Sequence, residues 1–151
     1  MIQLRGIGHV LLRVTDVEKA KAFYTMVLGF ETVEEDPEHG GTFMALPGQS
    51  HAIDLFPVRD AEAAARQAPG VRGHGHIAFR VDSEAALKEA WLGLREHGVA
   101  ITRAVDHVSQ KSIYFQDPDG NALEIYYELP NARHLFREGR QDRDAPLTFA
   151  G

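Results

Sequence analysis

The stretch from Val105 to Glu124 gathers several residue types that can transfer protons or bind a metal. It contains His107, Tyr114 and, after the tight turn Asp-Pro-Asp-Gly, the carboxylate of Glu124. A strand–turn–strand segment can direct such side chains into one cavity, because alternate residues of a strand share a face. Imidazole suits proton transfer near neutral pH, and a carboxylate suits a divalent metal. The stretch therefore predicts part of a catalytic site.

Two further histidines hold equivalent places in a weak internal repeat. The segment Ile7–Val14 (IGHVLLRV) resembles His74–Val81 (HGHIAFRV), with Gly-His, apolar positions and Arg-Val in register. In each segment the residues that alternate with the histidine are all apolar and should pack under a helix. We therefore expect His9 and His76 to point away from the helices and into a cleft.

Each repeated segment is followed by a helical pattern and three short strand-like runs. The first helix should begin near Thr15–Asp16, where Thr15 and Glu18 can form a capping box, and end at Gly29. The second should begin near Asp82–Ser83 and end at Gly98. The expected strands are Phe30–Glu35, Thr42–Leu46 and His51–Val58 in the first repeat, and Ala100–Val105, Ser112–Gln116 and Ala122–Glu128 in the second. The fold class is therefore α+β, with tandem βαβββ units that form a curved mixed sheet around a metal-binding cleft.

These elements predict one domain over residues 1–129. Repeat one covers about 4–58 and repeat two about 74–129, and 59–73 is expected to be a short surface helix and connector. The C-terminal tail, 130–151, either packs over the cleft or against a second subunit, or is loosely ordered.

The composition excludes several classes of protein. The 151 residues carry a net charge of −6 and no Lys/Arg cluster, which argues against a nucleic-acid partner. No apolar run approaches the roughly 20 residues that a membrane span requires. The absence of cysteine excludes disulfides and thiolate ligands. The first residues lack the layout of a signal peptide, so we expect a cytoplasmic protein.

The repeats and the Val105–Glu124 stretch resemble the vicinal oxygen chelate superfamily, and within it the type I extradiol ring-cleaving dioxygenases most closely. The resemblance covers roughly residues 4–129. It implies a non-haem Fe(II) enzyme that opens a catechol-like ring with O2, as in aromatic catabolism, although Mn, Ni, Zn or Co are also metals of such sites. Members of this size commonly form homodimers.

The resemblance also assigns roles to individual residues. His9, His76 and Glu124 match the metal ligands, and two imidazoles with one carboxylate form the facial triad of Fe(II) oxygenases. His107 and Tyr114 match positions that hydrogen-bond the substrate oxygens. His51 resembles the acid–base histidine, and His74, two residues before His76, is a candidate for a supporting role behind the metal ligands.

Asp54 leaves an alternative open. Overlaying the repeats places Asp54 opposite Glu124, at the position of a metal-binding Glu in glyoxalase I. His51 and Asp54 are three residues apart, so on a regular strand only one of them faces the cleft, unless a bulge intervenes or His51 lies before the regular part of the strand. If Asp54 does, the enzyme would be a glyoxalase-like lyase or isomerase with Asp54 as a fourth ligand. A third alternative is a drug-binding resistance protein, but such proteins lack the metal triad.

Overall fold

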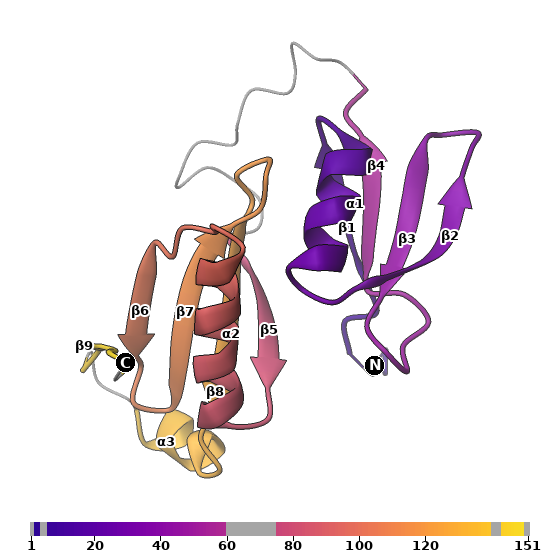
Figure 1. Cartoon of the computed structure of the whole chain (residues 1–151). Coiled ribbons are helices and arrows are strands. Elements are labelled where there is room, and N and C mark those ends of the chain that lie inside the picture. Colours follow the sequence, from indigo (N-terminus) through magenta and orange to yellow (C-terminus); the bar gives the residue numbers. More distant parts are fainter. Residues whose placement is uncertain (1, 4–5, 60–74, 140–142, 150–151) are drawn as a thin grey trace. The chain divides into compact units, whose positions relative to one another are not determined.

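The computed structural model describes residues 2–3, 6–59, 75–139 and 143–149. The chain divides into two compact units, Met1–Gln67 and Ala68–Gly151 (Figure 1). The helix expected in the connector and the side chain of His74 lie outside the described residues. No helix among the described residues is long and apolar enough to cross a membrane.

The first unit is one βαβββ motif. Its elements are β1 (Val10–Val14), α1 (Val17–Met26), β2 (Glu31–Asp36), β3 (Gly41–Ala45) and β4 (Ile53–Pro57). The sheet order is β1-β4-β3-β2, in which β1 pairs with β4 in parallel and the other pairs are antiparallel. The first strand of the motif is therefore hydrogen-bonded to the last.

The second unit repeats this motif and extends it. Its elements are β5 (Ile77–Val81), α2 (Glu84–Glu96), β6 (Arg103–Asp106), β7 (Gln110–Gln116), β8 (Ala122–Glu128), α3 (Ala132–Glu138) and β9 (Ala145–Pro146). The order is β5-β8-β7-β6-β9, with β5 and β8 parallel. The two mixed sheets confirm the expected α+β class and the tandem βαβββ units. Part of the C-terminal tail is a helix and a short edge strand.

Both major helices begin at capped residues. The Asp16 side chain accepts a hydrogen bond from the Lys19 backbone N–H at 2.9 Å, and Ser83 caps α2 through the Ala86 N–H at 3.0 Å. The capping box expected at Thr15 was wrong, because Asp16 holds the N-cap position. The Asp16 carboxylate supplies the acceptor that the first turn requires.

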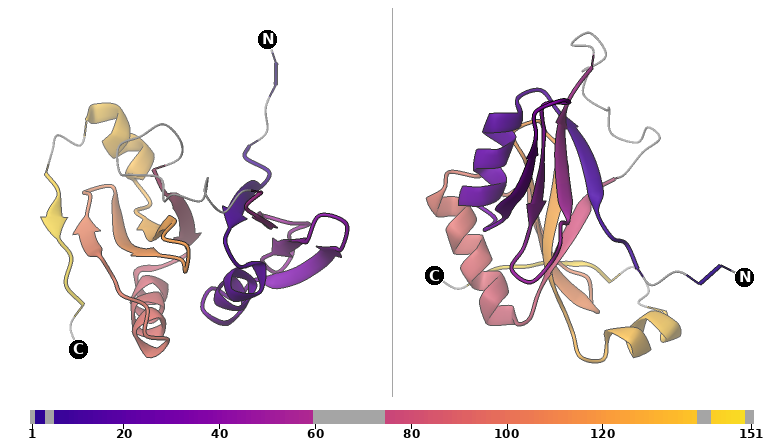
Figure 2. Two further views of the ribbon diagram at one scale, coloured as in Figure 1. Left: turned by 90° about the horizontal axis from the view of Figure 1, so that it is seen from above. Right: turned by 90° about the vertical axis from the view of Figure 1, so that its right-hand side faces the viewer.

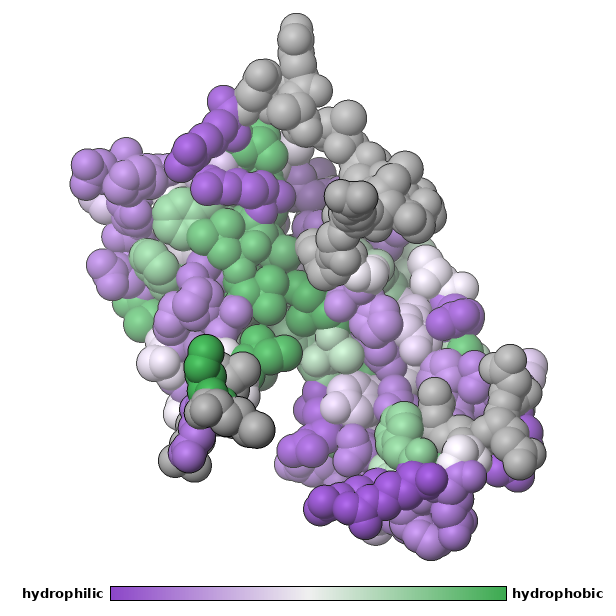
Figure 3. Space-filling view, turned by 180° about the vertical axis from the view of Figure 1, so that it is seen from behind, coloured by the Kyte–Doolittle hydropathy of each residue, from purple (hydrophilic) through white to green (hydrophobic). Residues whose placement is uncertain are grey.

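One helix lies against one face of each sheet (Figures 1 and 2). In β1, Leu12 and Val14 are buried while Leu11 and Arg13 are exposed, which confirms the expected alternation. Figure 3 shows the side turned away from α1 and α2, where hydrophobic residues lie exposed among hydrophilic ones. Burial of the helix-facing side chains stabilises each layer, at about 25 cal/mol per Å² of apolar surface.

Candidate metal and proton-transfer site

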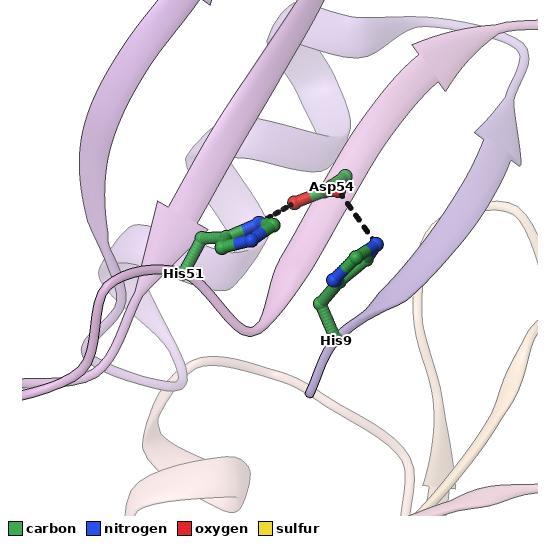
Figure 4. A group of neighbouring side chains, drawn as sticks. All are labelled: His9, His51 and Asp54. Atoms are coloured by element: carbon green, nitrogen blue, oxygen red, sulfur yellow. Dashed lines mark hydrogen bonds and ion pairs between the residues drawn. The ribbon is translucent and has the colours of Figure 1, made fainter. Parts of the chain in front are cut away.

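In the first unit, two histidines meet one buried carboxylate. Asp54 lies on β4 and is 2% exposed. Its Oδ1 accepts a hydrogen bond from His51 Nδ1 at 2.7 Å, and its Oδ2 lies 3.6 Å from His9 Nε2 (Figure 4). The two imidazole rings stack with centroids 4.4 Å apart. One potential ligand atom from each residue lies within 4.8 Å of the others, so this cluster could hold a metal ion.

Both His51 and Asp54 lie on this side, because the condition of a regular strand is not met at His51. Strand alternation does not apply to His51, because β4 begins at Ile53 and His51 lies in the segment before it. Gly48, at a φ of 83°, lies in the turn that leads into this segment. The chain therefore brings His51 back toward Asp54 instead of placing it on the opposite face.

The burial of Asp54 requires these partners. An ionised carboxylate removed from water is costly unless hydrogen bonds or a cation compensate it. His51 provides the short contact, and His9 lies near the second oxygen. Two arrangements are chemically reasonable: the carboxylate and imidazoles can bind a divalent metal, or Asp54 can hold His51 by Nδ1 and leave Nε2 as the proton-transfer atom.

The second unit contains a matching pair. Glu124, on β8, is also 2% exposed, and its Oε2 lies 2.8 Å from His76 Nε2. Its Oε1 accepts a hydrogen bond from Gln110 Nε2 at 3.0 Å. Gln110 also contacts Ser112 Oγ at 3.2 Å. Both oxygens of this carboxylate are thus engaged, one by an imidazole and the other by an amide.

Tyr114 and His107 lie beside this pair. Tyr114, on β7, is directly opposite Glu124 in the antiparallel register, and its ring packs edge-on against His76 with centroids 5.7 Å apart. His107 Nε2 is hydrogen-bonded to the Tyr114 hydroxyl at 2.9 Å. The Arg103 guanidinium carbon lies 4.5 Å from the centre of the Tyr114 ring. Strand pairing thus brings the predicted groups of this unit together.

The environment of Tyr114 favours its neutral phenol. Burial raises the pKa of Tyr114, and the negative charge of Glu124 raises it further. Tyr114 therefore stays protonated at neutral pH and can donate as well as accept a hydrogen bond.

A cavity of about 350 Å³ adjoins these groups, and its lining includes His76, Tyr114 and Arg103. A larger hollow of about 530 Å³ lies against Trp91 and Arg95 of α2, and its lining contains neither a histidine nor a carboxylate. The smaller cavity is therefore the better candidate for a substrate, because His76 and Tyr114, both predicted site residues, line it.

The predicted residues form two local clusters. His9, His51 and Asp54 meet in the first unit, and His76, Glu124, His107 and Tyr114 meet in the second. The triad of His9, His76 and Glu124 takes ligands from both units and remains a prediction.

Three polar groups of the second cluster were not predicted from the sequence. Gln110 and Tyr114 are four residues apart on β7, so their side chains lie on the same face of the strand. This two-residue alternation was the sequence feature that could have indicated Gln110 as a site residue. Arg103 lies opposite Tyr114 on β6, a pairing that the sequence did not indicate. Asp144 contacts His107 Nδ1 at 2.8 Å, and no local pattern predicts that contact.

Residues 6–125 match the model of the Glyoxalase/Bleomycin resistance protein/Dioxygenase superfamily, and the chain belongs to this family. Together with the βαβββ units, this makes it a vicinal oxygen chelate protein, a class that includes metal-dependent enzymes acting on small molecules.

Curated relatives within the family carry different activities. The chain is 29% identical to biphenyl-2,3-diol 1,2-dioxygenase 2 of Rhodococcus globerulus over 93% of this chain and 73% of the relative. It is 28% identical to catechol-2,3-dioxygenase of Bacillus subtilis (strain 168) over 83% of this chain, but spans only 42% of that relative. It is also 33% identical to the metallothiol transferase FosB of Shouchella clausii (strain KSM-K16), covering 82% of this chain and 80% of that protein.

Among solved structures, the lactoylglutathione lyase of Agrobacterium tumefaciens is similar, with a TM-score of 0.65 and 25% identity over 83% of this chain and 95% of that chain. The family is thus established, and the relatives include both oxygenases and enzymes of other reaction types.

Proposed function

We propose that this protein is an Fe(II)-dependent extradiol-type dioxygenase that opens a catechol-like ring with O2. The observation that carries the proposal is the hydrogen bond between His107 and Tyr114 beside the His76–Glu124 pair. A metal site alone is common to the family, whereas this added phenol–imidazole pair supplies groups for the oxygens of a diol. The similarity to two catechol-type dioxygenases supports the same conclusion.

The donor set fits a divalent metal. His76 and Glu124 already direct ligand atoms at each other, 2.8 Å apart, and Glu124 is buried beside neutral amide and phenol groups. His9 would complete two imidazoles and one carboxylate, the ligand set of non-haem Fe(II) oxygenases. When bound, Fe(II) supplies the redox chemistry that lets a closed-shell aromatic ring react with O2.

The remaining residues of the site would position the substrate and transfer its protons. His51 is held at Nδ1 by Asp54, so its Nε2 is the atom suited to accept a proton from a ring hydroxyl. Tyr114 and His107 would hold the substrate oxygen and the oxygen-derived groups. The partners implied are a small aromatic diol and O2, and we expect a homodimer.

A second candidate function is a glyoxalase-like lyase or isomerase. The cluster of His9, His51 and Asp54, with ligand atoms within 4.8 Å, favours it, because Asp54 could then be a fourth ligand. The structural similarity to a lactoylglutathione lyase agrees with this alternative. Such an enzyme would work with Mn, Ni, Zn or Co and without O2.

The test is O2 uptake by the protein reconstituted anaerobically with Fe(II) and then given a panel of catechols and hydroquinols. Catechol-dependent uptake of one O2 per ring-opened product is the expected result. Metal binding without uptake across the panel would reject the dioxygenase. The protein reconstituted with Ni²⁺ or Zn²⁺ in place of Fe(II), and given hemithioacetal substrates, would then test the lyase alternative.

A further inference from the structure

We propose that Asp144, in the C-terminal tail, is a positioning residue that fixes the direction of the hydrogen bond between His107 and Tyr114. The inference rests on the proposed function, since it concerns the same proton-transfer groups. Asp144 Oδ1 lies 2.8 Å from His107 Nδ1, and His107 Nε2 lies 2.9 Å from the Tyr114 hydroxyl. The imidazole is therefore held at both nitrogens.

The tail is anchored so that Asp144 can reach this position. Strand β9 pairs antiparallel with β6, with Asp106 opposite Ala145 and Val105 opposite Pro146. The Leu147 N–H donates to the Ala104 carbonyl at 3.1 Å. Farther along, the Phe149 ring lies 5.4 Å from Trp91 of α2. Asp144 directly precedes this paired segment, next to the end of β6 where His107 lies.

The backbone around His107 is also well held. The His107 N–H donates to the Gln110 carbonyl at 2.8 Å, and the Asp106 side chain accepts from the Val108 N–H at 2.8 Å. Val108 adopts a φ of 71°, a conformation that residues other than glycine seldom take. The His107 side chain is only 12% exposed. Its ring therefore has little freedom to turn away from its two partners.

The chemistry of the partners fixes the tautomer. A neutral imidazole carries a hydrogen on one nitrogen and a lone pair on the other, and a carboxylate only accepts. The contact with Asp144 therefore puts the hydrogen on Nδ1, which makes Nε2 an acceptor for the Tyr114 hydroxyl. The Tyr114 oxygen then presents lone pairs, and not its hydrogen, to a hydroxyl group of the substrate.

The consequence is a directed chain of hydrogen bonds from the substrate hydroxyl to Tyr114, from Tyr114 to His107, and from His107 to Asp144. Without Asp144, Nε2 could carry the hydrogen instead, and the Tyr114 hydrogen would point at the substrate. Carboxylates that orient a metal-binding histidine are commonly worth about 10–100-fold in activity or affinity, and we apply that range to His107. Because Asp144 is half exposed, we expect an effect near the lower end, about tenfold in kcat.

The test is Asp144→Asn, with Asp144→Glu as the conservative variant. An asparagine amide can donate as well as accept, so it removes the preference for hydrogen on Nδ1. We would record imidazole ¹⁵N–¹H spectra of the ¹⁵N-labelled full chain with Zn²⁺, a diamagnetic probe, and assign His107 with His107→Gln. Asp36→Asn is the matched control, because Asp36 forms a similar contact with His39 Nδ1 at 2.9 Å on the surface of the first unit.

The expected result is hydrogen on Nδ1 of His107 in the wild type and in Asp144→Glu, and a mixed or reversed tautomer in Asp144→Asn. Asp36→Asn should leave His107 unchanged. With a turnover assay, Asp144→Asn should lower kcat about tenfold without loss of metal. An unchanged His107 tautomer in Asp144→Asn would overturn the inference. The spectra decide it even if no catechol is oxidised, so its failure is distinct from failure of the proposed function.

Discussion

Asp54 of β4 and Glu124 of β8 hold the same place in the strand registers of their two units. Each lies opposite the second residue of the neighbouring parallel strand, and each is 2% exposed. Each also meets the histidine that directly precedes that strand, at 3.6 Å for His9 and at 2.8 Å for His76. Asp is one methylene shorter than Glu, which explains the longer distance in the first unit. We therefore propose Glu124 as the metal ligand and Asp54 as the partner of His51.

Glu124→Gln should weaken metal binding much more than Asp54→Asn. Glutamine keeps the shape of the side chain but removes the anionic ligand, so we expect the Kd for Fe(II) to rise by more than about tenfold. Asp54→Asn should keep one metal per chain and lower turnover, because it releases His51. Anaerobic titration with Fe(II) and metal analysis after desalting measure both effects. Loss of metal from both Asp54→Asn and Glu124→Gln would support the lyase alternative, in which Asp54 is a fourth ligand.

Tyr114→Phe should keep the metal and lose turnover. The substitution removes only the hydroxyl that His107 contacts, and loss of one proton-transfer or hydrogen-bonding group costs about 100-fold in rate. Tyr127→Phe is the matched control, since Tyr127 and Glu124 point to opposite faces of β8. Initial rates of ring opening, normalised to bound metal, give the comparison. Full activity of Tyr114→Phe would refute the assigned role.

The raised pKa of Tyr114 predicts a loss of stability in alkali. Its ordinary value is 10.0, and burial, followed by the charge of Glu124, raises it in the folded protein. The protonated Tyr114 phenol contributes to the free energy of unfolding. This contribution is complete below the unfolded-state pKa of 10.0, and it declines as pH rises through the higher folded-state pKa. The free energy of unfolding of the wild type should therefore fall more between about pH 9 and about pH 11 than that of Tyr114→Phe. Urea denaturation of both proteins at the two pH values measures the two decreases in free energy. The decreases should be equal if Tyr114 ionises normally.

Features that depend on local periodicity could be predicted from the sequence. The repeat around His9 and His76, the apolar faces of the first strands and the cap at Ser83 depend on residues a few positions apart. Parallel pairing of the first and last strand of each motif then places the carboxylates beside the histidines.

The contacts that could not be predicted depend on turns and on long-range pairing. His51 reaches Asp54 because the segment before β4 is not a strand, and a two-residue period says nothing about such a segment. Asp144 reaches His107 because β9 pairs with β6, about 40 residues earlier in the chain. No composition or spacing near Asp144 indicates its contact with His107.

Two glycines should respond oppositely to alanine. Gly93 lies within α2, and a Cβ added there meets no atom within 4 Å, so Gly93→Ala should raise the free energy of unfolding by about 0.5–1 kcal/mol. At Gly41, on β3, an added Cβ would overlap the Phe56 ring. Phe56 packs edge-on against Phe43, with ring centroids 5.6 Å apart, so it cannot move without losing that contact.

We therefore expect Gly41→Ala to lower the free energy of unfolding by about 1–3 kcal/mol, a usual cost of overpacking. Chemical denaturation measures both variants, and adding Phe56→Leu to Gly41→Ala should recover part of the loss, because the smaller side chain makes room for the methyl group. The explanation by ring overlap would be wrong if Gly41→Ala were neutral, or if Phe56→Leu only added its own destabilisation to that of Gly41→Ala.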